Sequence, residues 1–116
     1  MAASLEQEFQ RGIDLFNEGR FFDAHEAWER LWLRSGGEEK IFYQGLIQAA
    51  AALVQVQRGN RAGARSLWEK AQGKLASLPA AYRSIDLEQL RSGLAEFFDL
   101  TLSGRSPVAP PRIGRS

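Results

Sequence analysis

Cysteine is absent from this chain of 116 residues, and histidine occurs only once. The absence of cysteine excludes disulfide bonds, zinc sites with thiolate ligands and cysteine nucleophiles. Positive charge is not in excess either, because the formal net charge is +1, so nucleic acid is not the expected partner. Neither a phosphate-binding glycine loop nor a serine nucleophile elbow occurs. The composition is otherwise ordinary for a globular protein, with 44% hydrophobic and 25% charged residues. The length of the chain leaves room for one domain.

Signals for export or for insertion into a membrane are also lacking. Residues 1–6 do not have the basic and then apolar pattern of a signal peptide. The most apolar run, residues 45–56, is too short to span a bilayer and contains Gln48 and Gln55. We therefore expect a cytoplasmic protein that does not bind membranes.

Apolar residues recur at helical spacing along five segments of the chain. Ser4 and Gln7 have the spacing of a capping box at the start of the first segment, and Gly19 would end it. The other helices are expected at about residues 21–34, 38–58, 61–78 and 87–103. The helix at 38–58 is apolar on nearly every side, which is typical of the buried centre of a bundle. Since no strand pattern competes, the sequence predicts an all-α fold, a compact bundle of about five helices.

The two halves of the chain repeat one helical hairpin. When the sequence is shifted by 40 residues, four positions coincide: Gly19, Ala24, Trp28 and Glu29 fall on Gly59, Ala64, Trp68 and Glu69. In each copy the glycine permits the reversal between two helices, the alanine allows their close approach, and the tryptophan fills the space one turn later. The pattern resembles two tetratricopeptide-like hairpins, with the last helix covering an exposed end.

The helical domain is expected to span residues 1–103. The remaining residues, 104–116, contain three prolines and the basic side chains Arg105, Arg112 and Arg115. This segment has little apolar surface to bury, so we expect a disordered tail.

His25 and Glu29 are the first candidates for a functional site. They are four residues apart on one predicted helix, so they share a face and lie within reach of one metal ion. The order His-Glu-x-x-Glu is similar to the His-Glu-x-x-His zinc helix, with Glu29 in place of the second histidine. A third ligand would have to be a carboxylate such as Asp14, Glu18 or Asp23, or come from a second subunit.

A structural role for His25 is the competing interpretation. The residue lies beside the apolar stripe of Phe21, Trp28 and Trp32. A single histidine in that position is more often a core or interface residue that is hydrogen-bonded to a carboxylate or carbonyl. The sequence favours this interpretation over a ligand or catalytic role.

A row of glutamines on the helix at 38–58 is the second candidate. Gln44, Gln48 and Gln55 fall within a narrow arc, next to the small residues Gly45 and Ala52. Buried amides need hydrogen-bond partners, and small neighbours leave room for them. If the helix at 21–34 packs there, Gln44 or Gln48 could meet His25 or Glu29. The alternative is a solvated or interface stripe.

Several motifs together resemble a known family. They are residues 16–26 (FNEGRFFDAHE), Glu29 with Trp32, residues 44–51 (QGLIQAAA), residues 58–60 (RGN) and residues 63–64 (GA). Across about residues 9–79 the chain resembles the family called domain of unknown function 309. The resemblance implies an all-helical bundle and no established activity.

The signature positions of that family are matched here by Gly19, Ala24, His25, Glu26, Glu29, Trp32, Gly45 and Gly59. Members often have a histidine towards the end of the third helix, where this chain has Val54, Gln55 and Val56. If that histidine binds a metal in the family, the resemblance implies that this protein has lost it.

Two functions follow from these observations. The favoured hypothesis is a non-catalytic module that forms a homodimer or binds a protein partner, with Phe22, Leu33 and Tyr43 as apolar surface to be covered. The alternative is a small hydrolase that uses His25 with Glu26 and Glu29, either with a divalent metal or by general-base catalysis. No other cofactor is expected.

The repeat separates candidate site residues from residues that the hairpin itself requires. His25, Glu26 and Trp32 fall opposite Arg65, Ser66 and Gln72 in the second copy. The hairpin itself therefore does not require these three residues, whereas Glu29 recurs and is partly explained by the scaffold.

Overall fold

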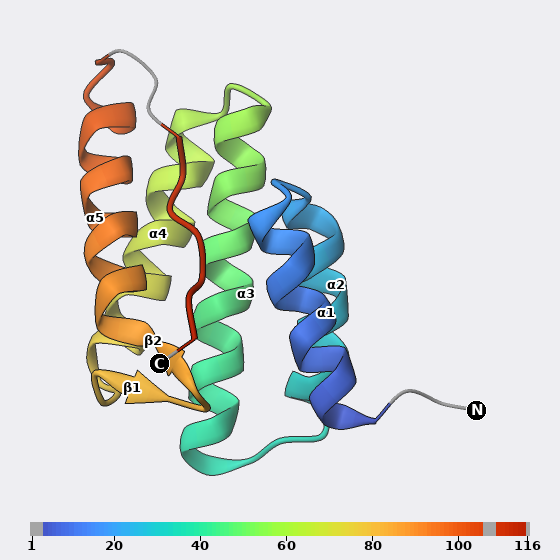
Figure 1. Ribbon diagram of the computed structural model, residues 1–116. Helices are drawn as coiled ribbons and strands as arrows, with labels where there is room; N and C mark the ends of the chain where they lie inside the picture. The colour runs from blue at the N-terminus through green and yellow to red at the C-terminus, as the bar shows by residue number, and fades with distance from the viewer. Residues whose placement is uncertain (1–3, 106–108, 116) are drawn as a thin grey trace.

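Five helices make up most of the computed structural model, which describes residues 4–105 and 109–115 (Figure 1). Two short strands precede the last helix. In chain order the elements are α1 (Leu5–Asn17), α2 (Phe21–Leu33), α3 (Gly37–Gln57), α4 (Arg61–Ala76), β1 (Ala81–Tyr82), β2 (Ile85–Asp86) and α5 (Leu87–Leu102). The predicted all-α bundle is thus confirmed. Along the described ranges, no helix combines the length and the apolar character needed to cross a membrane.

The turns between paired helices repeat in detail. Gly19 and Gly59 both have a positive φ, +80° and +76°. After each glycine, the next N–H donates back into the preceding helix: Arg20 to the Leu15 carbonyl at 2.9 Å, and Asn60 to the Gln55 carbonyl at 2.8 Å. The two donors are 40 residues apart, and so are the two acceptors. The repeat seen in the sequence is therefore also a repeat of the geometry that ends the helix.

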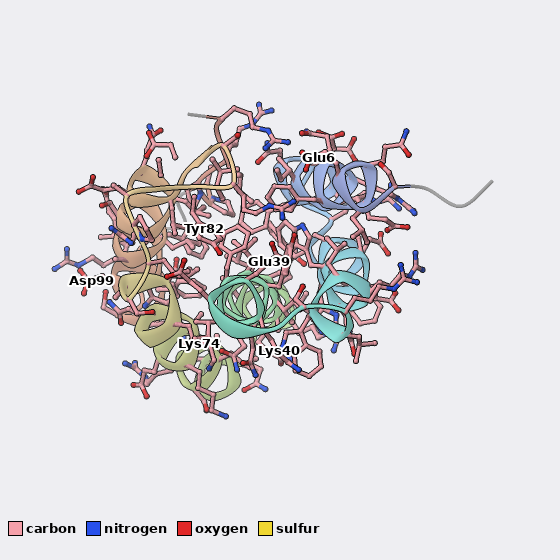
Figure 2. The ribbon with its side chains drawn as sticks, turned by 90° about the horizontal axis from the view of Figure 1, so that it is seen from below. Glu6, Glu39, Lys40, Lys74, Tyr82 and Asp99 are labelled. Carbon is pink, nitrogen blue, oxygen red and sulfur yellow. The ribbon has the colours of Figure 1, made fainter. Side chains whose placement is uncertain are left out.

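The core is centred on α3, which lies between α2 and α4 when the bundle is seen from below (Figure 2). Trp28 is fully buried, and its indole nitrogen donates to the Phe9 carbonyl at 3.4 Å. Trp68, its counterpart in the second hairpin, stacks on Phe98 of α5 with ring centroids 4.9 Å apart. The tryptophans of both copies therefore fill the interior, as the repeat predicts.

The β1–β2 hairpin was not predicted. Ala81 pairs with Asp86 and Tyr82 with Ile85 in antiparallel register. The two turn residues, Arg83 and Ser84, have φ values of 50° and 62°. Because glycine or asparagine usually occupies such positions, the sequence carried no turn signal here.

Residues 109–115, which we call the C-terminal strap, depart from the prediction of a disordered tail. The strap lies extended across α3 between α1 and α5 (Figure 1). Ile113 is 4% exposed, and its backbone makes two hydrogen bonds with the Asn17 side chain. A buried isoleucine and paired backbone groups compensate for the low apolar content. The prediction for residues 106–108 and 116 lies outside the described residues.

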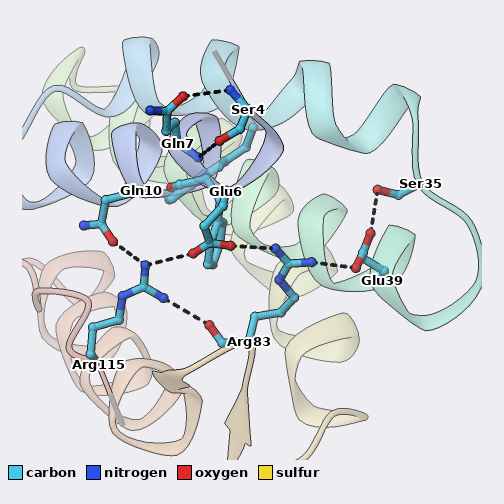
Figure 3. A network of polar contacts seen from close by, with 10 residues as sticks. Ser4, Glu6, Gln7, Gln10, Ser35, Glu39, Arg83 and Arg115 are labelled. Atoms are coloured by element: carbon cyan, nitrogen blue, oxygen red, sulfur yellow. Dashed lines mark hydrogen bonds and ion pairs between the residues drawn. The ribbon is translucent and has the colours of Figure 1, made fainter.

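Two arginines tie the hairpin and the strap to α1 and α3 (Figure 3). Arg83 donates to Glu39 at 2.8 Å and to Glu6 at 3.2 Å, and its guanidinium lies over the Phe9 ring. Arg115 donates to Gln10 and to the Arg83 carbonyl. Burial alone would lower the pKa of Arg83, but its interactions with Tyr43, Glu39 and Glu6 outweigh that effect and raise it.

Tyr43 was expected to be surface that a dimer would cover, and this expectation is wrong. The side chain is 2% exposed and packs against Phe9 and Phe42. Burial raises the pKa of Tyr43 to about 12. The prediction failed because β1–β2 and the network around Arg83 cover this part of α3.

Candidate functional site

A pocket of about 160 Å³ lies between α2 and α3. We call it the α2–α3 pocket. Its lining is His25, Glu29, Trp32, Gln44, Ile47 and Gln48. Five of these six are residues that the sequence singled out, on two helices that were predicted separately. Their convergence follows from the antiparallel packing of α2 on α3, which brings one helix face opposite the other.

His25 and Glu29 form a pair at the rim of the pocket. The Nε2 atom of His25 is 3.7 Å from the Glu29 Oε2 atom, as expected for an i, i+4 pair. The side chains are 27% and 48% exposed. Phe22, one turn before His25, stacks on the imidazole with ring centroids 5.9 Å apart. The imidazole is therefore held between a carboxylate and an aromatic ring, and it stays in contact with solvent.

Lysines flank the other side of the pocket. Lys40 Nζ lies 4.9 Å from the centroid of the Trp32 ring, and Lys74 of α4 donates to Gln48 Oε1 at 2.9 Å. In Figure 2 both lysines lie on the side of α3 away from Tyr82. The pocket thus has an acidic edge on α2 and a basic edge on α3 and α4.

Two polar atoms at the pocket have no hydrogen-bond partner within the described residues. They are His25 Nδ1 and Trp32 Nε1, both shielded from solvent. Buried donors and acceptors are normally paired. At this pocket, contacts among the described residues therefore leave two hydrogen-bonding atoms without a partner.

Two predicted site residues do not join the pocket. Glu26 is exposed on α2 and is not part of the lining. Gln55, further along the glutamine row, accepts a 3.0 Å hydrogen bond from Asn60 instead. Ile47 was missed; it is one of several apolar residues on α3, and its spacing gave no sign that it would face a pocket.

A metal site is not assembled by the described residues, since no group of three or more His, Asp or Glu side chains among them could hold an ion. The three carboxylates proposed as further ligands have other partners. Asp23 pairs with Arg20 at 2.9 Å, Glu18 with Arg20 at 4.0 Å, and Asp14 accepts from Gln10. His25 and Glu29 remain as two candidate ligands, fewer than a catalytic zinc normally has.

A second, larger pocket of about 530 Å³ lies between α4 and α5. It is related to the first by the repeat. On α4, Arg65, Glu69 and Gln72 follow His25, Glu29 and Trp32 by 40 positions. On α5, Ala95, Phe98 and Asp99 follow Gln44, Ile47 and Gln48 by 51 positions. Each pocket therefore forms where the second helix of a hairpin meets the next helix, and this α4–α5 pocket is a built-in comparison for the first.

Exposed apolar side chains gather on the two helices that form the α2–α3 pocket. Phe22 is 51% exposed, Leu33 68% and Ile41 41%, and Leu5 on α1 is the fourth such residue at 52%. Scattered exposed apolar residues need no explanation, but three on the pair of helices that forms a pocket resemble an interaction surface. We call this surface, with the pocket, the α2–α3 face.

The comparisons with known proteins give a family and one relative. A family model described as "Domain of unknown function (DUF309)" matches residues 9–67. An uncharacterized protein from Aquifex aeolicus (strain VF5) is 34% identical over 93 residues. The aligned part makes up 79% of this chain but only 28% of that relative. The pocket residues on both α2 and α3 lie inside the region matched by the family model.

Proposed function

The chain belongs to the DUF309 family, whose description names no activity, and on that premise we propose that it is a non-catalytic helical module that self-associates through its α2–α3 face. The observation that carries the proposal is the α2–α3 pocket of about 160 Å³, with the half-exposed Phe22 stacked on His25 of its lining. In a symmetric dimer, each copy supplies both the pocket and the protruding Phe22 side chain, so the same contact forms twice.

The size of the pocket suits an aromatic ring. A cavity of about 150 Å³ in a protein interior holds one benzene molecule. The phenyl ring of Phe22 from a second copy would therefore fill the α2–α3 pocket, where Trp32 and Ile47 supply apolar contacts. Covering two half-exposed aromatic rings at once gives the pairing its hydrophobic gain.

Charge also favours a second copy of the chain as the partner. Glu26 and Glu29 are exposed on α2, whereas Lys40 is exposed on α3 and Lys74 flanks it from α4. In a two-fold arrangement, α2 of one copy lies against α3 of the other, so the acidic edge meets the basic edge twice. Complementary edges of this kind set orientation and exclude other partners.

Sedimentation equilibrium over a range of protein concentrations tests the proposal. The wild type is expected to form a dimer. Gln44→Phe, which fills the pocket from within, should raise the dissociation constant at least tenfold. Ala95→Phe is the matched control, because it places the same ring at the equivalent position in the α4–α5 pocket. A wild type that is monomeric throughout, or a Gln44→Phe variant that dimerises as tightly, would contradict the proposal.

A hydrolase remains the second candidate because one observation favours it, the His25–Glu29 pair at an accessible pocket. The carboxylate would orient the imidazole, which would act as a general base near neutral pH. Elemental analysis of protein purified without chelator, together with ester and amide hydrolysis by wild type and His25→Ala, tests it. If the protein contains no stoichiometric metal and shows no turnover that depends on His25, this candidate has no support.

A further inference from the structure

The C-terminal strap occupies a groove in the way a bound peptide does. Its residues 109–115 cross α3 between α1 and α5 and end beside β2 (Figure 1). The strap contacts α1 and the β1–β2 hairpin, and Figure 2 shows Glu6 of α1 and Tyr82 of β1 on the other side of α3 from Lys40 and Lys74. The groove is therefore separate from the α2–α3 face. The groove takes no part in the proposed self-association.

The backbone of Ile113 and Gly114 makes three of the hydrogen bonds that hold the strap. The Asn17 side chain donates to the Ile113 carbonyl at 3.0 Å and accepts from the Ile113 N–H at 2.7 Å. The Asp86 N–H donates to the Gly114 carbonyl at 2.9 Å, and Ile85 forms a β-bridge with Arg115. A side-chain amide and a strand edge that pair with an extended backbone are typical of peptide recognition by strand addition. Such contacts do not depend on which chain supplies the backbone.

Side chains of the strap enter distinct positions along the groove. Ile113 is buried, Pro111 packs against Gly93 of α5, and Arg115 lies over the Phe9 ring. Gly93 matters here, because an added Cβ would come within 2.8 Å of Pro111. The groove thus contacts an apolar residue, an arginine two positions after it and a proline two positions before it.

The strap does not fill the groove completely. A hollow of about 230 Å³ remains beside Pro110, lined by Phe21, Leu53 and Phe97 among others. Another of about 450 Å³ lies between the strap and the side chains of Asn17 and Gln89. The burial of Ile113, the packing of Pro111, the contacts of Arg115 and the backbone hydrogen bonds must offset the entropy of ordering the segment, so the gain and the cost are of similar size. A segment held so weakly can exchange with a competitor.

We propose that the groove between α1 and α5 is a binding site for an extended segment of another protein, and that the strap occupies it in cis until such a segment displaces it. The partner segment has an apolar residue at the Ile113 position and an arginine at the Arg115 position. Glu6 and Gln10, which contact Arg115, recognise that arginine.

A fluorescently labelled synthetic peptide with the sequence of residues 109–115 (APPRIGR) tests the proposal on full-length variants. Ile113→Asp unseats the strap by placing a carboxylate in a buried position, and Arg115→Glu does so by opposing Glu6. Fluorescence polarisation should show both variants binding the peptide at least tenfold more tightly than wild type. Arg112→Ala, at an exposed strap position, is the control and should behave as wild type. Adding Asn17→Ala to Ile113→Asp should weaken binding at least tenfold.

Three results would overturn the proposal. One is equal or absent binding of the peptide by the strap variants. Another is loss of the helical circular-dichroism signal in both strap variants, because a strap that the fold cannot release is part of the core. The third is a wild-type dimer that the peptide dissociates, which would assign the groove to the same segment of a second copy rather than to another protein.

Discussion

The ring of Phe22 stacks on the imidazole of His25, with centroids 5.9 Å apart and planes inclined by 29°, although Phe22 is half exposed. An exposed aromatic that is already held in one orientation loses less freedom when a partner covers it. His25 is in turn paired with Glu29, so the row along α2 presents Phe22 beside the pocket. This arrangement gives His25 a role in association that does not require catalysis.

Replacing His25 should separate that role from a structural one. His25→Ala is expected to change the free energy of unfolding by less than about 1 kcal/mol, because its pair with Glu29 is partly exposed and such pairs contribute little. Self-association should weaken severalfold, since Phe22 loses the ring that orients it. Arg65→Ala, the repeat-equivalent change on α4, is the control for both measurements. If His25→Ala unfolds the protein, the residue is structural and the interface account loses its support.

Two helical glycines should respond in opposite ways to alanine. At Gly12, an added Cβ would lie 2.1 Å from Nε1 of the fully buried Trp28, so Gly12→Ala should destabilise the fold by about 1–3 kcal/mol. At Gly73, nothing lies within 4 Å, and alanine should stabilise the helix by about 0.5–1 kcal/mol. Urea unfolding followed by circular dichroism measures both. A Gly12→Ala variant as stable as wild type would show that Trp28 is not fixed against α1.

The sequence predicted the hairpins and singled out most residues of the α2–α3 pocket as candidates, because both depend on regular helices. Gly19 and Gly59 identify the turns, and helical spacing puts His25, Glu29 and Trp32 on one face. Once α2 packs antiparallel to α3, the position of Gln44 and Gln48 opposite them follows. The functional role of these residues stays a prediction.

The parts that could not be predicted depend on contacts between distant residues. Asn17 and Ile113 are 96 positions apart, and neither has a local pattern that indicates the other. Arg83 has a positive φ, and its side chain pairs with Glu6 of α1 and Glu39 of α3. The hairpin formed there is what buries Tyr43. The strap and the β1–β2 hairpin thus follow from tertiary contacts that override weak local preferences.

Stability at high pH should depend on Tyr43. Burial is the largest cause of its raised pKa, about 12 against an ordinary value of 10.0, and Glu39 and Glu6 add to it. The pKa of Tyr43 is higher in the folded than in the unfolded protein. The contribution of its neutral phenol to the free energy of unfolding is therefore complete below pH 10 and is lost as the pH rises to about 12. The loss is about 2–3 kcal/mol at most.

Tyr43→Phe should remove this pH dependence, because no phenol then ionises at that position. Urea unfolding of wild type and variant across this pH range measures the difference, and ultraviolet titration of tyrosinate identifies the missing ionisation. Tyr82, whose pKa burial also raises, remains in the variant as an internal reference. Identical stability profiles for the two proteins would show that Tyr43 is not buried as a neutral phenol.

The turn of the β1–β2 hairpin offers a further matched pair. Arg83 and Ser84 both have a positive φ, where glycine is less strained. Ser84 is exposed, so Ser84→Gly should stabilise the protein by up to about 1 kcal/mol. Arg83→Gly relieves the same strain but removes the contacts with Glu39 and Glu6, and it should be destabilising overall. Thermal unfolding of both variants tests this, and a stabilising Arg83→Gly would show that the network contributes little.

The central claim, self-association through the α2–α3 face, is tested most directly by light scattering on two variants that each replace an exposed apolar residue by glutamate, one on α2 and one on α1. Phe22 and Leu5 are exposed almost equally, 51% and 52%, but Phe22 stacks on His25 of the pocket lining, whereas Leu5 lies on α1. We predict a wild-type dimer, a monomer for Phe22→Glu and a dimer for Leu5→Glu at the same protein concentration. A monomeric wild type, or a Phe22→Glu variant that keeps the mass of the dimer, would contradict the account.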